Sequence, residues 1–164
     1  MDSTRAWKYP LAVTLTAILV VGFIASPAFA ASPHFYKTPT IVDNPNDSLT
    51  ATFKAAGLGK LVTNVFLTSS GGVAYLACVD SGGAVSELLA FEPIQGLVTT
   101  VQPRNGNVAA TVTIGPPPLP SASQVCADPS DTIEVIKITY DNVVLHIQQN
   151  SFDILTYNFG SVET

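Results

Sequence analysis

From residue 31 onward, apolar and polar side chains alternate with a period of two, and turn-forming residues interrupt the alternation about every 8–12 positions. Successive side chains of a β-strand point to opposite faces, so this pattern predicts strands that each bury one face. No window shows the apolar recurrence of an amphipathic helix; residues 84–92 come nearest and are expected to form one short helical turn. The chain is therefore predicted to be all-β beyond its N-terminal region.

The predicted fold is an antiparallel two-sheet sandwich of the immunoglobulin-like type, and a small β-barrel is the alternative. A length of 164 residues fits one domain, which we place at residues 31–164 after a 30-residue leader. Immunoglobulin domains carry a buried Trp beside their disulfide. The only Trp of this chain is Trp7, in the leader, so the likeness is expected to concern the sandwich architecture alone.

Residues 1–30 have the three parts of a signal peptide: a short basic start, an apolar run and a small-residue cleavage site. The run Leu11–Ser26 carries no charge, and Ala28 and Ala30 occupy the two positions where signal peptidase excludes large side chains. We expect a signal helix that is cleaved between Ala30 and Ala31, and a secreted or cell-surface protein without further membrane contact. The alternative is a retained anchor, although a helix of 16 residues reaches only about 24 Å across a hydrocarbon core of roughly 30 Å.

Net charge restricts the partners of the part predicted to be exported. Residues 31–164 contain five Lys and Arg against eleven Asp and Glu side chains, which gives a net charge of −6. Nucleic-acid binding requires a basic patch that displaces counterions from phosphate, so no nucleic-acid partner is expected. Anionic lipid repels such a chain for the same reason.

Cys78 and Cys126 are the only cysteines of the chain, and an even number in an exported protein predicts a disulfide. Two free thiols are the alternative, and a zinc site with His34 and His146 fits no familiar ligand spacing. Closing a loop of this length is worth about 4 kcal/mol in a chain-entropy model. The proline-rich stretch 115–120 cannot join a sheet interior, so we expect it to cross one end of the domain, attached through Cys126 to the strand of Cys78.

Three turn signals determine the predicted order of strand pairing. Ser69–Gly72 is expected to reverse the chain between two apolar strands, and Asn105-Gly106 to close a hairpin because both residues tolerate a positive φ. Asp141-Asn142 is expected to form a third tight turn. The segments predicted as strands are 40–43, 49–53, 61–68, 73–79, 97–102, 108–114, 132–140, 143–148 and 152–159.

No group of polar side chains matches a known catalytic motif, and no cofactor is expected. His146 lies in a predicted strand without a nearby nucleophile signature, and His34 lies close to the predicted new N-terminus, so both are interpreted as structural or solvated. Asp80, Asp128 and Asp131 flank the two cysteines and would meet if the disulfide forms. Coincidence is the preferred interpretation, and metal binding or acid–base chemistry is the alternative.

Two loops carry further candidate residues. The cluster Asp43–Asp47 predicts a turn, with a weak calcium site as the alternative, although Pro45 interrupts the ligand spacing. Asn46 begins an N-glycosylation sequon, which matters only in a host that glycosylates exported Asn. Arg104 and Asn105, at the predicted hairpin tip, are candidate contacts to a partner.

Three short motifs resemble those of a group of small, uncharacterised secreted bacterial proteins: Ser32-Pro33-His34-Phe35, Ala56-Gly57-Leu58-Gly59 and Pro103-Arg104-Asn105-Gly106. The resemblance spans most of residues 32–150. It implies export and a small domain with a cysteine pair. It implies no activity, ligand or catalytic residue for this chain.

The predicted function is that of an exported, non-enzymatic β-sandwich module that binds a protein or a glycan through its loops. A secreted hydrolase that depends on carboxylates or a metal is one alternative, and a structural component of the cell envelope is another. A binder should present a flat or groove-like patch of Tyr and Asn. A hydrolase should gather at least two of Asp80, Asp128, Asp131 and His146 around one point. The loop tips expected to make contacts are 43–47, 80–83, 103–107 and 115–131.

Overall fold

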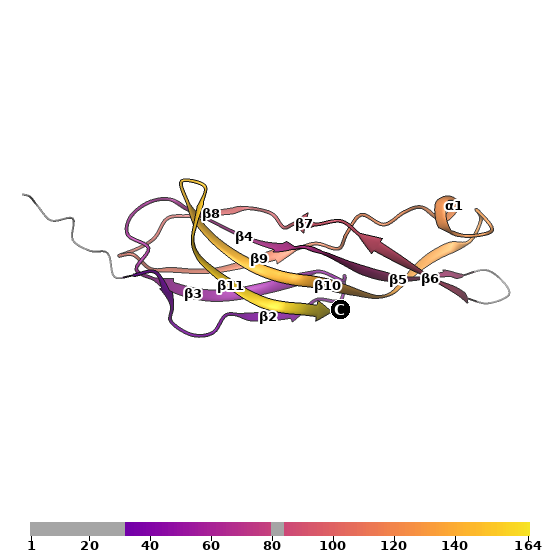
Figure 1. The fold of residues 1–164 in the computed structure, drawn as a ribbon, viewed down its shortest axis with the longest axis horizontal. Coiled ribbons are helices and arrows are strands. Elements are labelled where there is room, and N and C mark those ends of the chain that lie inside the picture. The colour runs from indigo at the N-terminus through magenta and orange to yellow at the C-terminus, as the bar shows by residue number, and fades with distance from the viewer. Residues whose placement is uncertain (1–31, 80–83) are drawn as a thin grey trace, which may run out of the picture.

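The computed structural model describes residues 32–79 and 84–164, which form two antiparallel β-sheets and one short helix (Figure 1). The expected all-β two-sheet sandwich is confirmed. The two sheets have separate hydrogen-bond ladders within the described residues, which distinguishes the fold from the barrel alternative. The predicted signal helix with its cleavage site and the loop tip 80–83 lie outside the described residues.

The smaller sheet is built around β3 (Leu49–Ala56). β1 (His34–Phe35) and β2 (Thr40–Asp43) pair end to end with one edge of β3, and β9 (Val108–Ile114) pairs with the other edge. β3 alternates as its sequence predicts. Leu49, Ala51, Phe53 and Ala55 are buried against the second sheet, whereas Thr52 and Lys54 are exposed.

In the larger sheet, β4 (Thr63–Ser69) and β5 (Gly71–Val79) follow one another in the same direction, interrupted only at Ser70 (Figure 1). Both pair antiparallel with β10 (Thr132–Gln149), and the register continues across the interruption, with Thr68 opposite Val144 and Gly71 opposite Asp141. The predicted hairpin between these two apolar strands is therefore wrong. They are two parts of one long strand.

Hydrogen bonds at the interruption explain why the chain kinks there instead of reversing. Ser69 Oγ lies 2.7 Å from the carbonyl oxygen of Gly71 and 2.8 Å from that of Asp141. The Ser70 N–H donates to the Asp141 carbonyl at 3.0 Å. Gly71 has a φ of 136°, which a glycine adopts without steric cost. These bonds keep the segment against β10, which offers more pairing than a local hairpin.

Three strands line the outer edge of β4 and β5: β6 (Ala84–Phe91) and the shorter β7 (Ile94–Gln95) and β8 (Thr99–Val101). The helical turn expected at residues 84–92 is therefore wrong, because β6 pairs with β5 along its whole length. The expectation of no helix in the domain also needs a small correction. One turn of helix, α1 (Ala122–Val125), occurs and contains no buried residue.

β10 is one strand of 18 residues where the sequence predicts two strands and a turn. Asn142, with a φ of 47°, forms a bulge at Asp141-Asn142, and the register of β10 against β11 (Phe152–Glu163) shifts there. The chain reverses instead at Asn150 and Ser151, which have φ values of 51° and 65°. The tight turn predicted at Asp141-Asn142 is wrong because β10 pairs with its neighbours on both sides before and after the bulge, which holds the strand extended.

The tight turn at Asn105-Gly106 is confirmed, but the hairpin around it is not. Asn105 and Gly106 have φ values of 53° and 77°, and Arg104 and Asn107 exchange two backbone hydrogen bonds of 2.9 Å. Beyond this bridge the strands separate, because β8 pairs with β4 and β9 pairs with β3. All seven residues of β9 pair with β3, more than the short β8 offers, so the turn connects the two sheets.

One apolar core lies between the sheets, and its largest fully buried side chains include Tyr140, Leu49, Leu67, Leu145 and Ile147. The larger sheet is longer than the smaller one. β5, β6 and the first half of β10 extend toward the end that carries α1 (Figure 1). Along this extension, the segment between β9 and β10 covers the larger sheet in place of the smaller sheet.

Candidate functional site

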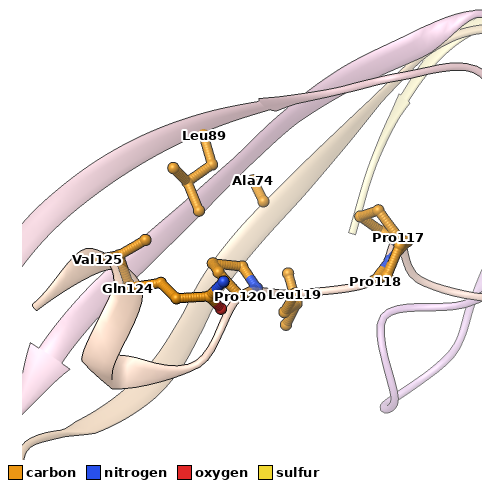
Figure 2. Close-up of a pocket in the computed structure, with 8 residues that line it drawn as sticks. All are labelled: Ala74, Leu89, Pro117, Pro118, Leu119, Pro120, Gln124 and Val125. Atoms are coloured by element: carbon orange, nitrogen blue, oxygen red, sulfur yellow. The ribbon is translucent and has the colours of Figure 1, made fainter. Parts of the chain in front are cut away.

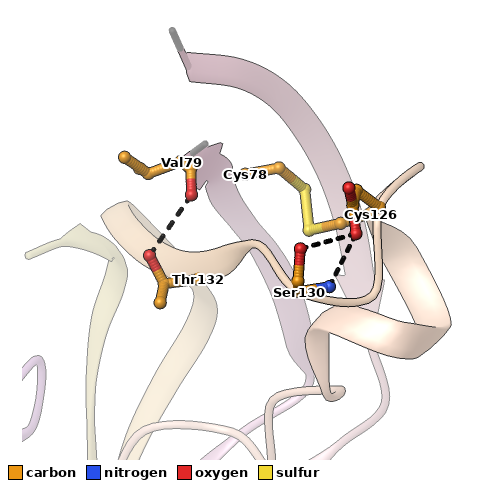
Figure 3. Close-up of a disulfide and its surroundings, with 6 residues drawn as sticks. Cys78, Val79, Cys126, Ser130 and Thr132 are labelled. Carbon is orange, nitrogen blue, oxygen red and sulfur yellow. Dashed lines mark hydrogen bonds between the residues drawn. A yellow bond between two sulfur atoms is a disulfide. The ribbon is translucent and has the colours of Figure 1, made fainter. Parts of the chain in front are cut away.

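The predicted disulfide is confirmed at the α1 end of the molecule. Cys78 of β5 and Cys126, directly after α1, are bonded with a Cα–Cα distance of 5.7 Å (Figure 3). Cys78 is also paired with Ile133 near the start of β10. The bridge therefore attaches the proline-rich segment to the strand that the sequence predicts.

A groove of about 440 Å³ lies between this segment and the larger sheet. Figure 2 shows Leu89 and Ala74 on the sheet side, facing the side chains of Pro120 and Leu119. Gln124 of α1 adds an amide to a lining that otherwise consists of apolar side chains. The groove is the seam along which the segment covers the sheet.

The carboxylates near the disulfide are arranged as a local turn. Asp80 lies outside the described residues. The Asp128 carboxylate accepts hydrogen bonds from the Ser130 N–H at 2.8 Å and the Ser130 hydroxyl at 2.7 Å, and these bonds lower the pKa of Asp128 (Figure 3). The Asp131 N–H donates to the Asp128 carbonyl at 3.1 Å. No group of three metal-ligating side chains occurs within the described ranges.

His146 lies far from these carboxylates. It follows Ile133, the partner of Cys78, along β10 by roughly 40 Å at a strand rise of about 3.3 Å per residue. The structure thus separates His146 from Asp128 and Asp131, so His146 is not one of the two residues that the hydrolase alternative could gather at this point.

Instead, His146 is held in a polar chain on the outer face of the larger sheet. Its Nε2 lies 2.9 Å from the Thr68 hydroxyl, and its Nδ1 lies 3.0 Å from the Asp153 carboxylate. The ring stacks on Phe66 with centroids 4.9 Å apart. Sequence reasoning missed this hydroxyl–imidazole–carboxylate order because Thr68 becomes a neighbour of His146 only through the pairing of β4 with β10.

The cluster Asp43–Asp47 forms the predicted turn. The Asn44 amide donates to the carbonyl and hydroxyl of Ser48 and to the hydroxyl of Thr50, each at 2.9 Å. Asn46, the residue of the glycosylation sequon, is exposed and accepts a hydrogen bond from the Ser48 hydroxyl at 2.7 Å. These side-chain hydrogen bonds explain the turn without a bound ion.

At the end of β10 away from the disulfide, the three motifs that are far apart in the sequence meet. β1 pairs His34 with Ala56, and the Leu58 N–H donates to the Gly106 carbonyl at 3.0 Å. The Gln149 amide, at the end of β10, donates to the Leu58 carbonyl at 2.7 Å. A cleft of about 450 Å³ opens here, which we call the motif cleft; its lining includes His34, Tyr36, Gly59, Lys60, Asn105 and Asn107.

Glycines form part of the floor of the motif cleft. Gly59 has a φ of 66°, and a Cβ placed on it would meet no atom within 4 Å. A Cβ on Gly106, at a φ of 77°, would lie 3.5 Å from the Gly59 nitrogen. The backbone at Gly59 therefore faces open space, and a ligand can approach it closely.

Tyr36 stands at the edge of the motif cleft with 58% of its surface exposed. Its backbone N–H donates to the Lys54 carbonyl at 2.9 Å, and its hydroxyl donates to Asn107 Oδ1 at 3.2 Å. The His34 ring contacts it edge to face at 6.0 Å. Tyr36 also lines a second cleft of about 570 Å³, the strand cleft, which includes Lys37, Lys54 and three threonines.

The predicted loop contacts have different positions at this site. Asn105 lines the motif cleft, whereas Arg104 is exposed beside it. Sequence reasoning missed Tyr36 and Asn107, although each directly follows one of the three motifs. A patch that contains Tyr and Asn is the feature expected of a binding module.

Comparisons with known proteins add little to this description. No family model and no curated protein matches the chain. Among solved structures, it is similar to part of DesR, a β-glucosidase from Streptomyces venezuelae solved in complex with D-glucose, with 20% identity and a TM-score of 0.32. The match covers 80% of this chain and 15% of that protein, and at this level of similarity it carries no argument about function. Among the described residues, no helix is long and apolar enough to cross a membrane.

Proposed function

We propose that this chain is an exported, non-enzymatic binding module that recognises its ligand at the motif cleft. One observation carries the proposal: three motifs separated by tens of residues supply the walls and floor of one open cleft. Loops on a rigid sandwich commonly carry binding residues. Here β1, the β3–β4 connection and the tight turn at Asn105-Gly106 hold the cleft residues in place through backbone hydrogen bonds.

The character of the lining supports binding more than covalent chemistry. It combines an exposed aromatic ring, two side-chain amides and a bare stretch of glycine backbone. Aromatic rings give large contact area at low entropic cost, and amides adapt as donors or acceptors. Neither Asn105 nor Lys60 forms a side-chain hydrogen bond with another described residue, so both are available to a ligand.

Binding of the purified protein to components of cell-envelope and culture-medium fractions tests this proposal. The purified, oxidised protein should be retained, and Tyr36→Ala should lower the retained amount at least about tenfold, the cost of removing an aromatic contact residue. The matched control is Leu119→Ala, because Leu119 is an exposed residue at the opposite end of the molecule. Equal retention of the native protein and the Tyr36→Ala variant would contradict the proposal.

Export is proposed from the leader pattern and agrees with a disulfide between the only two cysteines. The protein recovered outside expressing cells should begin at Ala31 and should contain no free thiol. Intact mass measured with and without reduction and alkylation reports both properties. A mass that includes residues 1–30 would favour the retained anchor.

A second candidate function, acyl hydrolysis, is favoured only by the order Thr68–His146–Asp153. In that reaction the Thr68 hydroxyl oxygen would attack an acyl carbon while its proton passes to His146 Nε2, and Asp153 would stabilise the protonated ring. The bond from the acyl carbon to the leaving group would then break as the ring returns the proton to that group, and water would release the acyl group from Thr68. A reactive hydroxyl displaces fluoride from the phosphorus of a fluorophosphonate probe. Such a probe should then label the native protein and not the Thr68→Val variant. Asp128→Asn is the control that should leave labelling unchanged. An unlabelled native protein would remove this candidate.

A further inference from the structure

We infer that the ligand of the motif cleft and the adjoining strand cleft is an acidic polysaccharide, a sugar chain that bears carboxylate or sulfate groups. The inference rests on the proposed function and specifies its ligand. Four observations carry it: the position of the cations, the absence of acids from the lining, the exposed ring between the two clefts and the hydroxyl and amide groups around them.

The basic side chains of the domain are concentrated at this end. Of the five Lys and Arg residues in residues 31–164, Lys60 lines the motif cleft, Lys37 and Lys54 line the strand cleft, and Arg104 lies beside Asn105. All four are exposed, and none forms an ion pair with another described residue. A net charge of −6 thus conceals a local cationic surface, which attracts anionic ligands.

In the part of the chain that the structure describes, acidic side chains lie away from the two clefts. The described residues that line the two clefts include no Asp or Glu. The acid nearest to this end along β11 is Asp153, and its carboxylate lies against His146 on the outer face of the larger sheet. The four cations are therefore not neutralised by neighbours, and a bound anion would supply their counter-charge.

The shape and polar groups favour a sugar chain over other polyanions. Tyr36 is shared by the two clefts, so one polymer can occupy both and place the apolar face of a sugar ring on the exposed Tyr ring between them. Thr38, Thr40 and Thr52 on one side and Asn105 on the other offer hydroxyls and an amide to sugar hydroxyls.

A nucleic acid fits this surface less well. Double-stranded DNA carries one charge per about 1.7 Å, far more than four cations can neutralise, and the rest of this acidic domain would repel the excess. A polysaccharide with at most one charge per sugar matches the sparser cations. The ligand class therefore follows from the charge density as well as from its sign.

Binding of defined polymers tests the inference. The purified, oxidised protein should bind polygalacturonate or a dextran sulfate of low substitution, with at most one sulfate per sugar, and the comparison of these two probes distinguishes carboxylate from sulfate. Binding should weaken several-fold between 50 and 500 mM NaCl, concentrations chosen to shorten the Debye length from above to below about 10 Å. Dextran, which is neutral, should bind at least about tenfold more weakly, the equivalent of roughly 1.4 kcal/mol.

Matched variants locate the interaction. Lys54→Gln and Lys60→Gln should each lower the affinity about two- to fivefold, as expected for an exposed charge pair, and Tyr36→Ala should lower it about tenfold or more. Lys137→Gln is the control, because Lys137 is the one basic residue outside the cluster and pairs with Glu163 at 3.0 Å. It removes the same charge and should change the affinity by less than about 1.5-fold.

The outcomes separate this inference from the proposed function. Equal binding of dextran that is lost in Tyr36→Ala would overturn the acidic class and leave the binding cleft in place. Preferential binding of oligo(dT) or polyglutamate would overturn the assignment to a sugar. If Lys137→Gln and Lys60→Gln lowered the affinity equally, the assignment of the binding site to the two clefts would be overturned. If the protein bound no acidic polysaccharide, the whole inference would be overturned.

Discussion

The larger sheet packs against a second sheet at one end of β10 and against a proline-rich segment held by a disulfide at the other. On the core face of β10, Val143, Leu145 and Ile147 are fully buried, whereas Ile133 and Val135 are only partly buried. The paired strands of the smaller sheet exclude solvent from β10 more completely than the proline-rich segment does, because that segment forms no ladder of backbone hydrogen bonds. A covalent bond thus secures the end where apolar burial is weaker.

The largest effect is expected from removing that bond. Cys78→Ser combined with Cys126→Ser should lower the free energy of unfolding by up to about 4 kcal/mol, because the unfolded chain regains the freedom of a 48-residue loop. Chemical denaturation measures the total, and hydrogen exchange should show faster opening of residues 115–131 than of β3 and β9. Equal acceleration of hydrogen exchange at both ends would contradict a stabilising role of the disulfide specific to its own end.

Two identical substitutions on β10 test the difference in burial between the two ends. Val143→Ala, at the sandwich end, should cost about 2–3 kcal/mol, because it removes two buried methyl groups and leaves a cavity. Val135→Ala, at the disulfide end, should cost about 1 kcal/mol, because the side chain is only partly buried. Denaturant midpoints at constant m-value report both. Equal costs would show that the proline-rich segment buries β10 as well as the smaller sheet does.

A smaller effect is expected where the two ends meet. The buried Tyr140 hydroxyl lies 2.5 Å from the Asp47 carbonyl and 3.3 Å from that of Gly115, where the proline-rich segment begins. Tyr140→Phe should cost about 1–2 kcal/mol, because the variant leaves these carbonyls without their donor. Tyr75→Phe is the control, expected to stay within about 0.5 kcal/mol, because the Tyr75 hydroxyl has no hydrogen-bond partner among the described residues.

The same tyrosine also predicts a dependence of stability on alkaline pH. Burial, and secondarily the charge of Asp47, raises the pKa of Tyr140 from 10.0 to about 12. Between these two values the unfolded state loses the proton that the folded state keeps, so stability should fall as the pH rises from 10 to 12. Denaturation curves of the native protein and of Tyr140→Phe at several pH values measure this. An unchanged slope in the variant would contradict the assignment.

How far the sequence predicts this molecule differs between its local and its long-range features. The alternation of apolar and polar residues predicted β2, β3 and β9. The tolerance of Asn105 and Gly106 for a positive φ predicted the turn between β8 and β9. The same local signals at Ser69–Gly72 and Asp141-Asn142 produce a kink and a bulge, because pairing with distant segments holds the chain extended on both sides. Turn chemistry therefore specifies a local backbone shape, and the available partners decide whether the chain reverses.

The candidate site was predicted only in part for a related reason. The sequence alone singles out Asn105 and the three motifs, but nothing local shows that β1 pairs with the end of β3 or that Leu58 bonds to Gly106. Ile136 illustrates the same limit on β10. A register shift against β5 leaves it 58% exposed, although simple alternation places it on the same face as Ile138 and Tyr140, both fully buried.

The in-line arrangement of β4 and β5 has a consequence for how quickly the chain reaches this state. Their partner β10 begins 53 residues after β5 ends, so the central pairing of the larger sheet must close a long loop, which slows folding. Once Cys78 and Cys126 are joined, only a few residues separate the bonded cysteine from the start of β10. Oxidation before collapse thus lowers the effective contact order of the sheet, and the oxidised chain should refold faster than the reduced one.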